Sequence, residues 1–70
     1  MPWYFFHFVG RQSEKFFSEP YASDYEAKEF GEVLARNFQR DMPDICSGSY
    51  ISVTNERGRE ISQILLSTTH

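Results

Sequence analysis

Residues 3–9 read Trp-Tyr-Phe-Phe-His-Phe-Val, and this aromatic run limits most strongly how the chain can fold. Such a run is typical of a β-strand, in which successive side chains point to opposite faces of the sheet. The run therefore divides into two sets, with Tyr4, Phe6 and Phe8 on one face and Trp3, Phe5, His7 and Val9 on the other. Both sets are too apolar for water, so both faces need cover, and for one of them it has to come from a second chain, a partner or the chain's own tail.

The 70 residues leave room for one domain, which we expect to span residues 1–70. Aromatic side chains make up 17% of the chain, and each can bury roughly 150–250 Å². Cys46 is the only cysteine, so no intrachain disulfide can form. We expect a stability of only about 3–5 kcal/mol for a domain of this size, which dimerisation would increase.

Residues 24–41 have the pattern of an amphipathic helix. Ser23 followed by Glu26 is the signature of a capping box at its start, and Pro43 prevents its continuation. The predicted buried stripe consists of Ala27, Phe30, Gly31, Leu34 and Phe38. A glycine within a helix costs about 1 kcal/mol of helix propensity, so we expect Gly31 to allow a close approach to the sheet.

Four strands are predicted around this helix, at residues 3–9, 14–18, 49–54 and 59–66. Pro20 follows the end of the second strand, and Gly58 closes a turn between the last two strands in a left-handed conformation. The order ββαββ predicts an α+β fold. We expect a small two-layer domain with a four-stranded antiparallel sheet and one helix on one face.

A single helix cannot cover both faces of a four-stranded sheet, so one face is expected to stay open. We place the helix over the face of Tyr4, Phe6 and Phe8. The candidate partner-binding residues on the opposite face are Trp3, Phe5, His7 and Tyr50. One of Phe16 and Phe17 joins them, because adjacent strand residues point to opposite faces. The alternative is that the tail at 67–70 or the loop at 41–48 folds over this face.

An exposed apolar face favours a non-enzymatic protein-interaction module that binds a second copy of itself or another protein. The alternative is a protein that binds single-stranded nucleic acid by stacking bases on the sheet aromatics. The net charge is −3, and the seven basic residues are scattered along the chain. Because phosphate binding usually needs a basic face, nucleic acid is the less favoured partner.

No catalytic, cofactor-binding or metal-binding motif is present in the sequence. Cys46 has no nucleophile motif around it that would pair it with His7 or His70, so we interpret it as a loop thiol. His7 is expected to be a structural histidine or a partner contact. Two histidines and one cysteine, far apart, match no metal-ligand spacing. Glu26, Glu29 and Glu32 lie near one side of the predicted helix, and we interpret their carboxylates as a solvent-exposed helix face.

The apolar segment at residues 1–9 lacks the basic leader and small-residue cleavage site of a signal peptide. It is also too short to cross a bilayer. A single free thiol suits a reducing compartment, so the expected location is the cytoplasm, without a membrane partner.

The first seven residues, Met-Pro-Trp-Tyr-Phe-Phe-His, resemble the opening of a family of small bacterial domains of unknown function, which typically begin Met-Pro-Arg-Tyr-Tyr-Phe-His. Residues 24–27 and 51–58 are similar to the family's Glu-Ala helix start and its Ile-x-Val-x-Asp-Glu-x-Gly hairpin. Trp3 replaces a basic residue, residues 18–22 replace an acidic, glycine-containing segment, and residues 65–67 replace a Leu-Pro-Phe end. The resemblance covers nearly the whole chain and implies the fold, but no activity, cofactor or partner.

Overall fold

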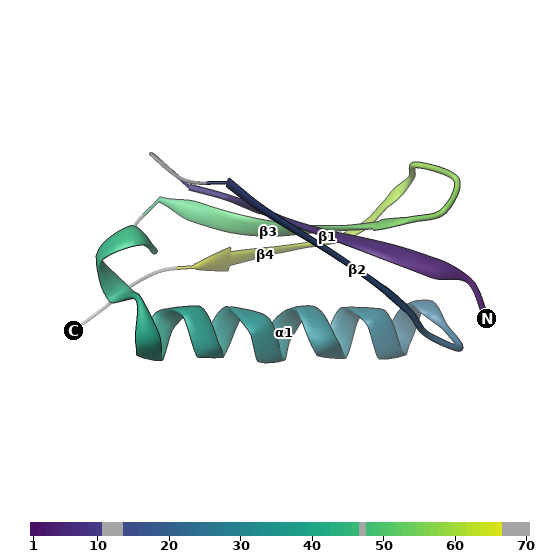
Figure 1. Cartoon of the computed structure of the whole chain (residues 1–70), viewed down its shortest axis with the longest axis horizontal. Helices are drawn as coiled ribbons and strands as arrows, with labels where there is room; N and C mark the ends of the chain where they lie inside the picture. Colours follow the sequence, from purple (N-terminus) through teal and green to yellow (C-terminus); the bar gives the residue numbers. More distant parts are fainter. Residues whose placement is uncertain (11–13, 47, 67–70) are drawn as a thin grey trace.

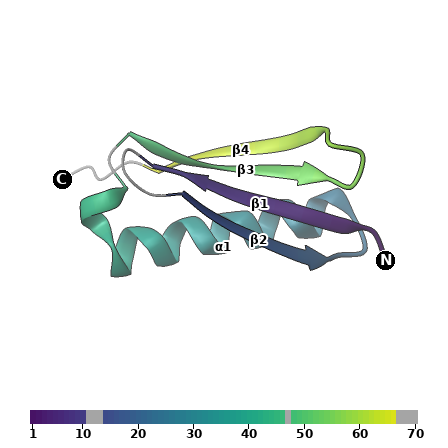
Figure 2. The same ribbon diagram turned by 45° about the horizontal axis from the view of Figure 1, so that its top comes forward.

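One antiparallel sheet and one long helix make up the computed structural model, which describes residues 1–10, 14–46 and 48–66 (Figure 1). The elements are β1 (Trp3–Val9), β2 (Glu14–Pro20), α1 (Asp24–Asp41), a short 3-10 helix η1 (Pro43–Ile45), β3 (Ser49–Asn55) and β4 (Glu60–Leu66). The strand order is β2-β1-β3-β4, with β2 and β4 at the two edges (Figure 2). The predicted α+β fold of order ββαββ, with the helix on one face, is confirmed.

Strand β2 runs to Pro20, past the predicted end at Ser18. Proline is tolerated here because β2 is an edge strand that pairs only with β1. The backbone N–H of Tyr21 donates to the carbonyl of Pro2 at 3.1 Å, so the ladder continues on the other side of the proline. The remaining strand boundaries lie within one residue of those predicted.

Helix α1 spans the predicted residues, and its start is held by the predicted cap. The Oγ of Ser23 accepts a hydrogen bond from the backbone N–H of Glu26 at 3.3 Å. The carboxylate of Glu26 in turn accepts from the N–H of Ala22 at 3.2 Å, one residue before the cap. At the other end, the N–H of Met42 donates to Phe38, and Pro43 opens η1.

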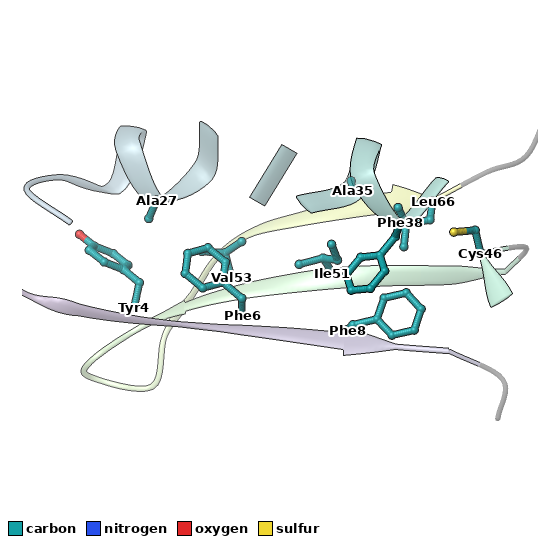
Figure 3. Packing of buried hydrophobic residues seen from close by; sticks show 10 residues of the cluster. All are labelled: Tyr4, Phe6, Phe8, Ala27, Ala35, Phe38, Cys46, Ile51, Val53 and Leu66. Atoms are coloured by element: carbon teal, nitrogen blue, oxygen red, sulfur yellow. The ribbon is translucent and has the colours of Figure 1, made fainter. Parts of the chain in front are cut away.

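The core lies between α1 and the face of β1 that carries Tyr4, Phe6 and Phe8, as predicted (Figure 3). The buried apolar residues are Tyr4, Phe6, Phe8, Ala27, Ala35, Phe38, Cys46, Ile51, Val53 and Leu66. Ala35 belongs to the helix contact although the predicted stripe omits it, whereas Phe30 and Leu34 pack at its margin. The helix is therefore rotated slightly about its own axis relative to the prediction, so that its small residues lie nearest the sheet.

Gly31 sets the distance between α1 and the sheet, as expected from its place in the helix stripe. A Cβ atom at this position would lie 2.8 Å from Cδ1 of Ile64 and 3.0 Å from Cγ2 of Val53. Both separations are below ordinary van der Waals contact. The absence of a side chain at Gly31 therefore lets the helix backbone lie directly on β3 and β4.

The predicted turn between β3 and β4 is confirmed. Gly58 has a φ of 83°, a conformation that favours glycine. The side-chain carbonyl of Asn55 accepts hydrogen bonds from the N–H groups of Arg57 and Arg59, at 2.9 and 3.0 Å. A bulge between Val53 and Thr54 shifts the register just before this turn.

The hydroxyl of Tyr4 joins the first strand to the start of the helix. Tyr4 is 3% exposed, and its hydroxyl donates to Oδ1 of Asp24 at 2.6 Å. This hydrogen bond, followed by burial and the negative charge of Asp24, raises the pKa of Tyr4 to about 12. The bond therefore favours the protonated phenol in the folded protein.

We expect the stability lost at alkaline pH to be smaller in Tyr4→Phe than in the wild type. Because the folded-state pKa of Tyr4 is raised from 10.0, its contribution is complete below that value and is lost as the pH rises through about 12. Urea unfolding at a series of pH values between about 8 and 11 measures the difference. Tyr21 and Tyr25 titrate in both proteins, so parallel curves would contradict the role given to Tyr4.

Candidate functional site

The sheet face opposite α1 is assembled from all four strands. Residues paired across antiparallel strands share a face, so Phe16 and Ser52 lie on either side of His7, and Ser18 and Thr54 on either side of Phe5. We call the resulting surface the open face. It comprises Trp3, Phe5, His7, Val9, Glu14, Phe16, Ser18, Pro20, Tyr50, Ser52, Thr54, Glu60, Gln63 and Leu65.

Large apolar side chains are exposed on the open face. The exposed fractions are 48% for Trp3, 45% for Phe5, 69% for Phe16 and 73% for Leu65. Tyr50 is half-buried between its neighbours Val9 and Leu65. The structure thus brings the four predicted residues, including His7, together on one surface. Apolar side chains gathered in this way are typical of an interaction surface.

The described part of the 41–48 loop does not cover the open face. Its 3-10 helix η1 packs against α1, on the helix side of the sheet (Figure 1). Cys46, at the end of η1, is buried in the core between the helix and the sheet (Figure 3). The alternative that residues 67–70 cover the face concerns a segment outside the described residues.

His7 lies near the centre of the open face and is held by stacking. Its ring lies parallel to that of Phe16, with centroids 4.2 Å apart and an interplanar angle of 17°. Its Nε2 is 3.9 Å from Oε1 of Glu14, beyond hydrogen-bond distance. This nitrogen is shielded from solvent and has no hydrogen-bond partner among the described residues. His7 thus contacts the neighbouring strand β2 through a ring stack.

The open face carries almost no charge. Its charged residues at neutral pH are Glu14 on β2 and Glu60 on β4, at the two edges of the sheet. Glu60 accepts a hydrogen bond from the hydroxyl of Ser52. The four strands contain one basic residue, Lys15, which pairs with Phe8 and so lies on the helix side. The face therefore offers no strand lysine or arginine for a phosphate group.

The residues considered for catalysis lie apart. His7 is on the open face and Cys46 is in the core on the other side of the sheet, so they do not form a nucleophile–base pair. The Sγ of Cys46 donates to the carbonyl of Met42 at 3.3 Å, and burial raises the pKa of the thiol. No group of three metal-ligating side chains occurs within the described ranges. His70 lies outside them.

We expect Cys46 to react slowly with a thiol reagent in the native protein. A buried thiol with a raised pKa can react only after local opening, so labelling should be on the order of 100-fold slower than in denaturant. Following the release of thionitrobenzoate from Ellman's reagent measures both rates, with Cys46→Ser as the blank. Equal rates in native buffer and denaturant would place the thiol at the surface.

Two large, exposed apolar members of the open face, Phe16 and Leu65, were not assigned to it from the sequence. Phe16 and Phe17 are adjacent, so only the pairing of Phe16 with His7 decides which one faces outward. Leu65 lies in a predicted strand, but the bulge beside Thr54 changes the side-chain alternation counted from the turn. The pairing register with the neighbouring strand would have to be known to assign either residue to the open face.

Comparison with known proteins identifies no relative: no family model, curated protein or solved structure matches the chain. The resemblance of the first seven residues to a bacterial family therefore stays a prediction. None of the described helices is both long enough and apolar enough to cross a membrane.

Proposed function

We propose that this protein is a non-enzymatic protein-interaction module that forms a homodimer through its open face. The observation that supports the proposal most strongly is the exposure of Trp3, Phe5, Phe16 and Leu65 together on one sheet surface. Tryptophan and phenylalanine are enriched at protein interfaces, and tryptophan at their energetic centres. Covering these side chains would add buried area that a domain of this size needs.

A second copy suits this face because the face is nearly uncharged. The chain carries a net charge of −3, so two copies repel each other over most of their surfaces. At the centre of the open face, the residues paired with His7 across the sheet, Phe16 and Ser52, are uncharged. The two carboxylates are on the edge strands, where Oε1 of Glu14 is 3.9 Å from Nε2 of His7. Two copies can meet at this centre without bringing like charges together.

The shape of the face also suits a second copy. Two twisted sheets commonly pack face to face about 10 Å apart, with their strand directions within about 30° of each other. Identical sheets satisfy this relation with equal size and twist, and a two-fold axis makes the contact self-complementary. The resulting dimer would have the helices on its two outer sides and the aromatic faces in the middle.

The proposal predicts that Trp3→Ala and Phe5→Ser weaken self-association and leave the helix intact. Each substitution removes apolar area from the open face and nothing from the core. We expect sedimentation equilibrium to show a dissociation constant raised at least tenfold, the size of a modest hot-spot loss. Far-ultraviolet circular dichroism should remain unchanged.

Tyr25→Ala is the matched control, because Tyr25 is 67% exposed on α1, away from the open face. It should associate like the wild type. If all three variants associate equally, or the wild type remains monomeric at high micromolar concentration, the open face is not a dimer interface.

Binding of single-stranded nucleic acid is the second candidate, because Trp3 and Phe5 could stack on bases. The position of Lys15 on the helix side weighs against it. Titration of a fluorescent single-stranded RNA at low and high salt separates the two functions. Salt-sensitive binding that Trp3→Ala abolishes would favour nucleic acid over protein.

A cytoplasmic location accompanies the proposal. Its support is the lone thiol of Cys46, which has no disulfide partner in this chain and suits a reducing compartment.

A further inference from the structure

Strand β2 is an edge strand whose seven residues are all exposed. It pairs with β1 on one side, and no described element pairs with its other side. Helix α1 packs mainly against β3 and β4, so it leaves the outer edge of β2 accessible (Figure 2). A free edge presents unpaired N–H and C=O groups that can add a further strand.

The pairing with β1 determines which backbone groups of β2 point outward. Hydrogen-bonded and non-hydrogen-bonded pairs alternate along an antiparallel ladder. The hydrogen bond from the Tyr21 N–H to the Pro2 carbonyl shows that Tyr21 and Pro2 form a hydrogen-bonded pair. Because the two kinds of pair alternate, the odd-numbered residues of β2 are the ones whose backbone groups bond to β1. Glu14, Phe16 and Ser18 therefore direct both their N–H and C=O groups to the free edge. Pro20 directs only its carbonyl there.

We propose that two copies also associate edge to edge, through antiparallel pairing of β2 with itself about a two-fold axis at Phe17. In this register, Phe16 of one copy forms a hydrogen-bonded pair with Ser18 of the other. The two Phe17 rings meet across the axis, on the helix side of the sheet. Lys15 of each copy lies directly opposite Glu19 of the other, also on the helix side.

The charges of β2 select this register. The outward-facing backbone groups of the two β2 strands lie opposite each other only when the two-fold axis passes through a residue and not between two residues. The possible positions of the axis near the middle of β2 are therefore Phe16, Phe17 and Ser18. An axis at Phe16 would place Lys15 opposite Phe17, and an axis at Ser18 would place Phe17 opposite Glu19. The axis at Phe17 gives two pairs of opposite charges, which stabilise cross-strand contacts.

The same charges disfavour other strands at this edge. Charged side chains and proline are the features by which natural edge strands avoid indiscriminate pairing. Lys15 and Glu19 make no ion pair with another residue in the described ranges. Lys15 and Glu19 face opposite charges only when β2 pairs with a second, antiparallel β2. The same two charges that disfavour pairing with other strands therefore favour pairing with a second copy.

Edge pairing extends the sheet and leaves the open face uncovered. Its two-fold axis is perpendicular to the sheet, so both copies keep their helices on one side and their open faces on the other. Two four-stranded sheets would then form one continuous sheet with a doubled aromatic surface. The edge contact uses the outer backbone groups of β2 and the side chains on its helix side, whereas the face-to-face contact uses the side chains of the open face, so each can form without the other.

Charge reversal tests the register directly. Lys15→Glu and Glu19→Lys each place like charges opposite each other in both cross-strand pairs, and we expect each to weaken association roughly tenfold. The double variant restores both pairs of opposite charges, with the two signs exchanged, and its dissociation constant should lie within about threefold of that of the wild type. An equimolar mixture of the two single variants should also associate, because each supplies the charges that the other lacks. Sedimentation equilibrium at low salt, where charge effects are largest, measures the four cases.

Equal association of wild type and single variants, or weak association that neither the double variant nor the mixture rescues, would overturn edge pairing. So would a wild type that does not associate. Trp3→Ala separates the two contacts because it leaves β2 unchanged. If Trp3→Ala abolishes association and the charge series has no effect, only the face contact exists; the reverse result leaves only the edge contact.

Discussion

One helix can cover only one face of a four-stranded sheet, and the rest of this structure depends on that limit. Gly31 lets α1 lie directly on β3 and β4, and the face carrying Tyr4, Phe6 and Phe8 becomes the core. The same strand β1 carries aromatic side chains on its other face, where Trp3 and Phe5 remain about half exposed. The 3-10 helix η1 lies on the helix side of the sheet and does not cover them (Figure 1).

Local patterns were sufficient to predict most of the fold. The alternation along β1 separated the core set from the open-face set, because a strand has a fixed period of two. The helix start followed from Ser23 and Glu26, whose capping bonds are made within a few residues. The close approach at Gly31 followed from its position in the buried stripe of the helix. A glycine lowers helix propensity, and close packing against the sheet is the physical reason for placing one there.

Features that depend on contacts between distant segments were not predicted. The strand order and the choice between Phe16 and Phe17 are set by the pairing of β1 with its neighbours. The orientation of Leu65 depends on a bulge that leaves no local signal. His7 shows the same limit, because its stack with Phe16 arises from strand register and not from its own sequence context.

The most direct test of the central claim is the fluorescence of Trp3, the single tryptophan of the chain, as a function of protein concentration. Trp3 is 48% exposed in the isolated chain and lies on the open face. If a second copy covers this face, the emission maximum should move to shorter wavelength as the concentration rises through the dissociation constant. An emission maximum that is already blue-shifted and does not change with concentration would contradict the account, because it would mean that the chain covers its own face.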